Sequence, residues 1–306
     1  MASSRDVQGV SQESAVARVP DVQAVPQESA VARVRDVQAV SRESAVARVR
    51  GTTRLYAVLG DPVAQVRAPA LLNSLFDRLG TDAVLVPVEV GAGQLGAAIR
   101  GLTAVRNLDG LLVTVPHKTA CRELADRVTA TAALSGSVNA LRRLPGGGWE
   151  GANFDGEGFV RGLRAAGHEP GGATVCLAGA GGAGSAIAVA LLRAGARVTV
   201  WDVDASRASE LAARLAPHFP DRVTAAPAHI DADLAVNATP MGLRPEDGLS
   251  FDPRALKPGT LVADIIMKPR ETALLRAARE AGCAIQYGEP MLAEQLALYQ
   301  EFFRLE

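Results

Sequence analysis

The sequence predicts an α/β protein made of two units, the second of which is a doubly wound parallel sheet. From Arg54 to the C-terminus, short apolar runs typical of buried strands alternate with runs whose apolar residues recur at helical spacing. The chain has 306 residues, 48% of them hydrophobic, so it can bury two cores of about 150 residues each. We expect residues 51–155 to form the first unit and residues 156–288 the second, followed by a C-terminal helix over 289–306.

In the first unit, strands are expected at 54–59, 84–90 and 111–115, where short apolar runs are bounded by turn residues. Pro69 should open a helix that Gly80 ends, because the leucines between them share one face. A further helix is expected from Lys118 toward Ala133. The runs 138–144 and 149–153 should pair as a hairpin, since three consecutive glycines lie between them.

The second unit shows the alternation more clearly. A strand over 174–177 precedes a glycine-rich loop and a helix that Gly195 ends, and a strand over 197–203 and a helix over 206–215 follow. Further strands fit 234–237 and 261–266. Strands joined by helices favour parallel pairing, which predicts a doubly wound dinucleotide-binding type of sheet.

The first fifty residues contain a tandem repeat. Its units begin at Asp6, Asp21 and Asp36, so the period is 15 residues. This period is shorter than those of solenoid repeats, large apolar residues are few, and Pro20 and Pro26 break helices. We expect a disordered or weakly helical extension, with an amphipathic docking helix as the alternative.

Charge and cysteine content exclude several classes of partner. The net charge is −1 and the pI about 6.5, which leaves no basic field for nucleic acid. Cys121, Cys176 and Cys283 predict core thiols of a reducing cytoplasm rather than a disulfide frame or a metal site. Residues 171–192 carry no charge, but their glycines favour a strand, a turn and a helix over a membrane span. A small-molecule partner is therefore expected, with no nucleic acid, membrane or metal.

A glycine fingerprint opens the second unit. Residues 179–184 read GAGGAG, and the acidic Asp202 lies eighteen positions beyond Gly184. Such glycines permit a tight turn and let a pyrophosphate approach the N–H groups of a helix N-terminus. A dinucleotide is thus expected, a plain glycine-rich turn being the alternative. Because Asp202 could accept from ribose hydroxyls and would repel a 2′-phosphate, we expect NAD, with NADP less favoured.

Two proton-handling side chains precede this fingerprint. Lys118 follows an apolar strand and Pro116, and Asp155 follows the expected hairpin. Interconversion of an alcohol and a ketone moves a hydride at carbon and a proton at oxygen, so this pair beside a dinucleotide predicts an oxidoreductase. The plainer alternatives are a solvated lysine at a helix start and an aspartate that caps the helix from Glu157.

Seven blocks along the chain, in the same order, resemble those of the shikimate dehydrogenase family. They are Gly60-Asp61-Pro62-Val63, Val113-Thr114-Val115-Pro116-His117-Lys118, Gly136-Ser137-Val138-Asn139-Ala140, Asn153-Phe154-Asp155-Gly156, Gly179-Ala180-Gly181-Gly182-Ala183, Asn237-Ala238-Thr239-Pro240-Met241-Gly242 and Met291-Leu292-Ala293-Glu294-Gln295. The resemblance implies an N-terminal substrate domain, a C-terminal dinucleotide domain, a final helix that returns to the first, and a reaction site between the domains.

The resemblance also implies roles for single residues. Lys118 and Asp155 would be the catalytic pair, while Thr114, Asn139 and Gln295 would hold ring hydroxyls. Further candidates are Arg67 and Met267 at the substrate and, at the cofactor, Gly179, Ala180, Gly181, Gly182, Ala183, Gly184, Asp202, Asn237, Ala238, Thr239, Met241 and Gly288.

Some of these residues have structural alternatives. Gln295 falls on an apolar stripe of the last helix with Leu292, Tyr299 and Phe302. There its amide needs either a substrate or a core hydrogen bond. Asn139 and Asn153 could equally serve the hairpin.

Several positions depart from the family pattern. Val66 and Ala68 stand where serines usually receive the substrate carboxylate, and Phe154 and Met267 replace a threonine and a tyrosine. Arg67 could rebuild the carboxylate clamp, but in an extended segment it would point away from the pocket.

We expect an NAD-dependent dehydrogenase that moves hydride reversibly between the nicotinamide and a secondary ring hydroxyl of a shikimate- or quinate-like cyclic acid. It should act in the cytoplasm, with a homodimer as the candidate assembly. One alternative is a true shikimate or quinate dehydrogenase with a rebuilt clamp. Another is a catalytically silent nucleotide-binding protein, which would have no need of Lys118, Asp155 and Gln295 together.

Overall fold

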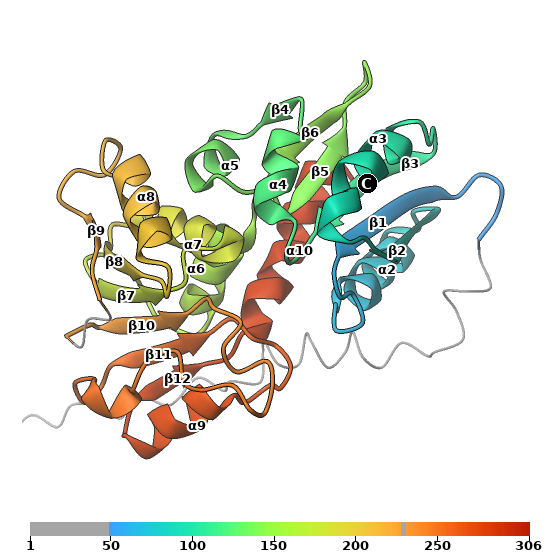
Figure 1. The fold of residues 1–306 in the computed structure, drawn as a ribbon. Helices are drawn as coiled ribbons and strands as arrows, with labels where there is room; N and C mark the ends of the chain where they lie inside the picture. The colour runs from blue at the N-terminus through green and yellow to red at the C-terminus, as the bar shows by residue number, and fades with distance from the viewer. Residues whose placement is uncertain (1–48, 228–230) are drawn as a thin grey trace, which may run out of the picture.

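The computed structural model describes residues 49–227 and 231–306, which form two α/β units, each built on a six-stranded sheet (Figure 1). Residues 1–48, and with them nearly all of the tandem repeats, lie outside the described residues. The expectation of an extension over 1–50 therefore stays a prediction.

The first unit holds a mixed sheet in the order β2-β1-β3-β5-β6-β4. β1 pairs in parallel with β2 and β3, whereas β5 pairs antiparallel with β3 and β6. Its elements are β1 (Arg54–Gly60), α2 (Ala68–Leu79), β2 (Ala83–Glu89), η2 (Ala92–Gln94), α3 (Leu95–Thr103), β3 (Leu108–Val113), α4 (Lys118–Glu123), β4 (Arg127–Val128), α5 (Ala130–Ser135), β5 (Ala140–Arg143) and β6 (Trp149–Ala152).

The single helix expected from Lys118 toward Ala133 is wrong. α4 ends at Glu123, and β4 then pairs in parallel with β6 before α5 begins. The break has two polar supports: the carboxylate of Asp126 accepts the Trp149 backbone N–H at 2.7 Å, and Thr129 caps α5 by accepting the Ala132 N–H at 3.3 Å. A two-residue strand with a distant partner leaves no periodic signal in the sequence.

The second unit holds a wholly parallel sheet in the order β12-β11-β10-β7-β8-β9, which confirms the doubly wound fold. The direction of winding changes between β7 and β10, the place where such sheets bind ligands. Its elements are α6 (Asp155–Ala165), β7 (Thr174–Ala178), α7 (Gly182–Arg193), β8 (Arg197–Trp201), α8 (Ala205–Leu215), β9 (Val223–Ala225), β10 (Leu234–Asn237), η3 (Pro253–Ala255), β11 (Leu261–Asp264), α9 (Ala273–Glu280), β12 (Ala284–Gln286) and α10 (Glu289–Phe303).

The last helix, α10, runs between the two units (Figure 1). It packs along α6 and also contacts α2 and β5 of the first unit. Two aromatic side chains of α10, Tyr299 and Phe303, are buried in the core of the first unit beside Tyr56 and Phe76. The C-terminal helix therefore returns to the first unit, as the resemblance implied.

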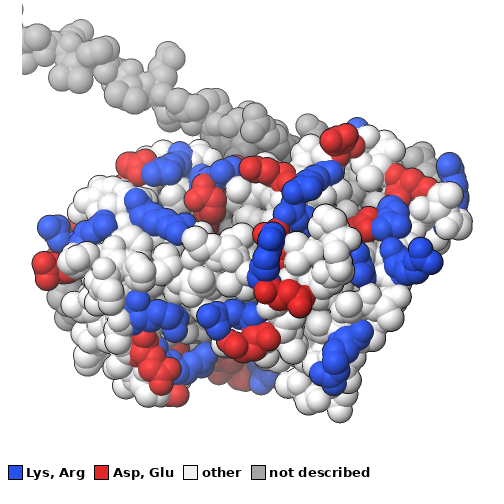
Figure 2. Space-filling view, turned by 90° about the horizontal axis from the view of Figure 1, so that it is seen from above, with Lys and Arg blue, Asp and Glu red and all other residues white. Residues whose placement is uncertain are grey.

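Figure 2 shows one face of the molecule, on which Lys and Arg side chains are interspersed with Asp and Glu. The three cysteines are buried and form no disulfide. Among the described helices, none is both long and apolar enough to cross a membrane.

Candidate active site

Lys118 begins α4, just beyond the carboxyl end of β3, and its ammonium reaches the carboxylate of Asp155. The Lys118 Nζ to Asp155 Oδ2 distance is 2.5 Å, and the two side chains are 14% and 4% exposed. The preceding His117 is buried and its Nε2 lies 2.6 Å from the Val90 carbonyl oxygen. His117 thus anchors the turn that presents the lysine.

Asp155 is the first residue of α6 rather than its cap. The Oδ1 of Asn153 accepts the Asp155 backbone N–H at 2.9 Å. Because Asn153 supplies that bond, the Asp155 side chain is left to face Lys118. This geometry disfavours the capping role considered for Asp155 and gives Asn153 a structural one.

The other carboxylate oxygen of Asp155 receives two amides. Nδ2 of Asn139 donates to Asp155 Oδ1 at 2.9 Å, and Nε2 of Gln295 lies 3.4 Å from the same atom. Asn139 directly precedes β5, while Gln295 comes from α10, so three separate elements converge on one carboxylate. All three side chains are buried. The structure therefore brings together Lys118, Asp155, Asn139 and Gln295.

Thr114 follows β3 and is half-buried, four residues before Lys118. Its methyl group packs over Gly60, where an added Cβ would lie only 2.4 Å away. A side chain at the end of β1 would therefore collide with Thr114, and the glycine leaves room for it.

The glycine loop between β7 and α7 is shaped as a dinucleotide requires. Gly179 has a positive φ of 102°, and a Cβ there would lie 2.8 Å from the Ala238 carbonyl oxygen. A Cβ on Gly184 would lie 1.9 Å from the Gly179 carbonyl oxygen. The first turn of the twelve-residue α7 leaves the N–H groups of Gly182 and Ala183 without helical partners. These residues fit a pyrophosphate.

The loop also touches the ion pair. A Cβ on Gly182 would lie 2.7 Å from the Lys118 Cβ, so the lysine stem packs directly on the loop. Ser137 donates its hydroxyl to the Gly182 carbonyl oxygen at 2.8 Å and accepts from Asn153 Nδ2 at 2.8 Å. Hydrogen bonds therefore run from the Asp155 backbone to the nucleotide loop. Sequence reasoning assigned no role to Ser137; its place two residues before Asn139 was the one available signal.

Asp202 lies at the end of β8, as expected, but its carboxylate is used within the protein. Oδ2 accepts the Ala180 N–H at 2.8 Å and Oδ1 accepts the Asp204 N–H at 3.0 Å. Asp202 thus holds the glycine loop. An amine of the Arg207 guanidinium lies 3.7 Å from where a Cβ on Gly181 would stand, so a cation borders the same loop.

Asn237 is fully buried and is satisfied by the protein itself. Its Nδ2 donates to the Met241 carbonyl oxygen at 3.0 Å and to Asp264 Oδ1 at 3.1 Å, and its Oδ1 accepts from the Thr239 N–H and hydroxyl. This side chain shapes the loop from Ala238 to Met241, and Ala238 lies against Gly179. Burial raises the pKa of Asp264, although three hydrogen bonds to its carboxylate oppose that rise.

The remaining predicted residues are Arg67, Met267 and Gly288. Arg67 has helical rather than extended backbone angles, so the expectation of an extended segment that points Arg67 away from the pocket is wrong. The Nη1 of Arg67 lies 3.2 Å from Glu289 Oε1 on α10. Met267 is half-buried in the segment after β11. At Gly288, a Cβ would lie 2.6 Å from the Ile265 carbonyl oxygen, so α10 starts tightly against that segment.

Phe154, the residue before Asp155, packs in an apolar cluster of the first unit. Val66 and Ala68 are half-buried and pack in the same cluster as Phe154, Phe302 and Tyr299. Tyr299, which sequence reasoning placed only on the apolar stripe, also hydrogen-bonds to Asn139 and Gln295.

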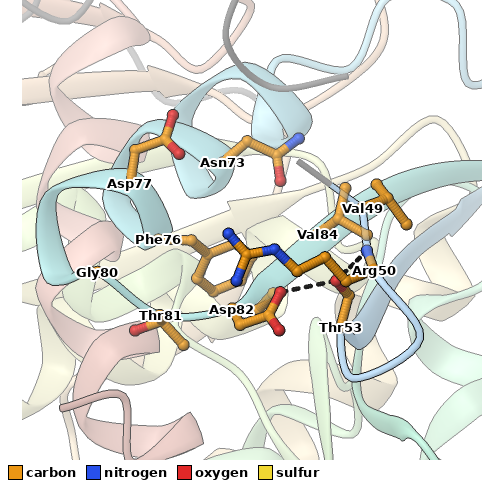
Figure 3. Close-up of a pocket in the computed structure, with 11 residues that line it drawn as sticks. Val49, Arg50, Thr53, Asn73, Phe76, Asp77, Gly80, Thr81, Asp82 and Val84 are labelled. Atoms are coloured by element: carbon orange, nitrogen blue, oxygen red, sulfur yellow. Dashed lines mark hydrogen bonds between the residues drawn. The ribbon is translucent and has the colours of Figure 1, made fainter. Parts of the chain in front are cut away.

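A separate hollow lies between α2, β2 and the segment before β1 (Figure 3). Two carboxylates line it, Asp77 and Asp82. Asp82 accepts hydrogen bonds from the hydroxyls of Thr52 and Thr53, both at 2.6 Å. No lysine–carboxylate pair is among its lining residues, so the candidate reaction site is the one at Lys118.

Comparisons with known proteins agree on one family. A model described as the shikimate dehydrogenase substrate binding domain matches residues 58–141. A protein of Rubrobacter xylanophilus named shikimate dehydrogenase (NADP(+)) is 41% identical over 253 residues, which cover 80% of this chain and 88% of that protein. The chain belongs to the shikimate dehydrogenase family.

Solved structures support the assignment. Shikimate 5-dehydrogenase from Thermus thermophilus in complex with NADP(H) and shikimate has 31% identity and a TM-score of 0.72, covering 82% of this chain and 93% of that one. 5-Ketofructose reductase of Gluconobacter sp. strain CHM43 has 31% identity and a TM-score of 0.71, covering 82% and 92%.

The expectation that NAD is preferred over NADP is wrong. The Rubrobacter relative is named for NADP(+), and the Thermus structure holds NADP(H). The prediction assumed that the carboxylate of Asp202 faces the ribose. In the structure this carboxylate accepts hydrogen bonds from the backbone N–H groups of Ala180 and Asp204.

Proposed function

We propose that this shikimate dehydrogenase family member is an NADP-dependent dehydrogenase that acts reversibly on a secondary ring hydroxyl of a shikimate- or quinate-like cyclic acid. The observation that carries the proposal is the buried Lys118–Asp155 pair packed against the glycine loop at Gly182. A nucleotide-binding protein without a reaction would have no use for a buried ion pair at that place.

Residues 51–155 with 289–306 would bind the substrate, and residues 156–288 the cofactor. The bound cofactor would supply the hydride acceptor or donor. In the ketone-reducing direction, the Lys118 ammonium donates a proton to the carbonyl oxygen, and the Asp155 carboxylate holds Lys118 in place and balances its charge. In the other direction the lysine takes the hydroxyl proton. Asn139 and Gln295 orient the carboxylate, and with Thr114 they offer polar groups to neighbouring hydroxyls. The three buried thiols, which form no disulfide, suit a reducing compartment such as the cytoplasm.

The position of Arg207 supports NADP as the cofactor. Its guanidinium borders the glycine loop near Gly181, and a guanidinium binds phosphate through paired donors. The Asp202 carboxylate holds the Ala180 N–H, and Arg207 is the cation beside the loop that could bind a 2′-phosphate. Arg207→Ala should raise KM for NADP by about tenfold or more while leaving KM for NAD within about twofold. Equal changes in KM for NADP and for NAD would show that Arg207 does not bind the 2′-phosphate.

The decisive test is the appearance of reduced nicotinamide absorbance with shikimate or quinate and NADP. Because Val66 and Ala68 offer no hydroxyl donors to a substrate carboxylate, we expect a low kcat/KM that Val66→Ser/Ala68→Ser raises by a hundredfold or more, since each charged hydrogen bond is worth about 1.5–3 kcal/mol. Robust activity that Arg67→Ala abolishes would instead show a clamp built on Arg67. Tight NADP binding without turnover of any cyclic acid would overturn the proposal.

A neutral ketose is a second candidate substrate. The similarity to 5-ketofructose reductase suggests this class of substrate. The apolar cluster around Val66, Ala68 and Phe154 also favours it, since these side chains offer no donor to a carboxylate. Arg67 is already paired with Glu289. Reduction of 5-ketofructose with NADPH, measured beside shikimate oxidation, separates the two classes.

A further inference from the structure

A chain of buried hydrogen bonds runs from α10 to the carboxylate of Asp155. Tyr299 lies one helical turn after Gln295 and is 3% exposed. Its hydroxyl accepts from Asn139 Nδ2 at 3.2 Å and donates to Gln295 Oε1 at 2.5 Å. The proposed reaction gives this hydroxyl no role, yet it joins the two amides that reach Asp155.

The direction of each bond follows from the donors available. Oδ1 of Asn139 accepts the Phe154 backbone N–H at 3.0 Å, so its amide nitrogen faces Asp155 and Tyr299. A tyrosine hydroxyl has one proton, and since its oxygen accepts from Asn139, the proton goes to Gln295 Oε1. The Gln295 amide nitrogen is then directed to Asp155 Oδ1.

The surroundings keep this hydroxyl in place as a donor. The Tyr299 ring packs edge-on against Phe154, with centroids 5.6 Å apart, and stacks on Phe303. Burial, together with the nearby charge of Asp155, raises the pKa of Tyr299 well above its usual value. Its proton is therefore retained at neutral pH.

We propose that Tyr299 is a positioning residue whose hydroxyl holds the Gln295 amide nitrogen toward Asp155. Without that hydroxyl, the Gln295 amide can turn by 180° and set its carbonyl oxygen against the Asp155 carboxylate. Asp155 would then lose one of two donors on Oδ1 and gain a repulsive contact, which disturbs the carboxylate that holds Lys118.

The first test needs no substrate and compares Tyr299→Phe with Tyr56→Phe. Tyr56 is also buried, lies in the same core on β1 and contacts Phe303, but has no part in the chain of bonds. In ¹⁵N NMR spectra, the Gln295 side-chain amide is identified by its loss in Gln295→Met. Its protons should exchange with water at least tenfold faster in Tyr299→Phe and at the parent rate in Tyr56→Phe. An unchanged rate in Tyr299→Phe would overturn the proposal.

The second test uses the double variant. With whichever of shikimate, quinate or 5-ketofructose the parent turns over, Tyr299→Phe should lower kcat about tenfold and leave KM for NADP unchanged. In the Gln295→Met background the same substitution should cost less than about twofold, because the orientation it controls no longer exists. Equal losses in both backgrounds would overturn the proposal. If the parent turns over none of these substrates, the proposed function fails while the exchange measurement still decides the role of Tyr299.

Discussion

Gly182→Ala tests the contact between the nucleotide loop and the proton-handling lysine. The added Cβ would lie 2.7 Å from the Lys118 Cβ and 3.3 Å from its Cδ. Since carbon atoms pack at about 3.5–4 Å, the stem or the loop must move by about 1 Å. The Lys118 Cβ is fixed to the backbone of α4, and Gly182 is tied to Ser137 through its carbonyl oxygen at 2.8 Å, so neither side yields freely.

A displacement of about 1 Å at reacting groups costs roughly a hundredfold in rate. Gly182→Ala should therefore lower kcat by about ten- to a hundredfold and the free energy of unfolding by about 1–3 kcal/mol. Steady-state kinetics and thermal unfolding measure both. Gly101→Ala in α3 is the matched control, because its Cβ would meet nothing within 4 Å; it should keep kcat and add about 0.5–1 kcal/mol of stability. A Gly182→Ala enzyme with the parent kcat would refute the proposed contact between the loop and the lysine.

Two further predictions concern stability and the N-terminal segment. Burial alone would raise the pKa of Glu150, but its ion pairs with Arg142 and Arg127 outweigh burial and lower that pKa from 4.5. The stability that these ion pairs contribute is therefore present above pH 4.5 and is lost as the pH falls through the folded-state pKa of Glu150. Glu150→Gln should lower the free energy of unfolding by about 1 kcal/mol at pH 7. It should also make that free energy depend less on pH in the acid range, and an unchanged pH dependence would contradict this prediction. A chain beginning at Gly51 keeps the threonine hydroxyls that bond to Asp82 and should match the full chain in kcat/KM; a loss beyond tenfold, about 1.4 kcal/mol, would show that the repeats matter.

The main strands and the parallel, doubly wound character of the second sheet could be predicted from the sequence because they depend on local signals. Apolar runs, glycine stops and the fingerprint at 179–184 each act within a few residues. The pairing of β4 with β6 could not be predicted in this way, because Arg127–Val128 is a strand only through a partner more than twenty residues away.

At the site, the sequence predicted which residues take part better than it predicted the partners of their side chains. Residue type and family pattern pointed to Lys118 and Asp155, and the fold brings them together. The same reasoning failed for Asp202, whose position at the end of β8 was right, because the direction of its carboxylate is set by the backbone of Ala180 and Asp204. Tyr299 was placed on an apolar stripe, since no periodicity distinguishes a ring that packs from a hydroxyl that bonds.

The central claim is that Lys118 moves the proton while the glycine loop holds NADP. Lys118→Ala keeps the Cβ that packs on Gly182 and removes the ammonium that reaches Asp155. The measurement is kcat for Lys118→Ala and for the parent on the same substrate, together with NADPH affinity followed by nicotinamide fluorescence. We predict a fall in kcat of about a hundredfold or more with NADPH affinity unchanged within about twofold. A retained kcat accompanied only by a higher KM would contradict the account.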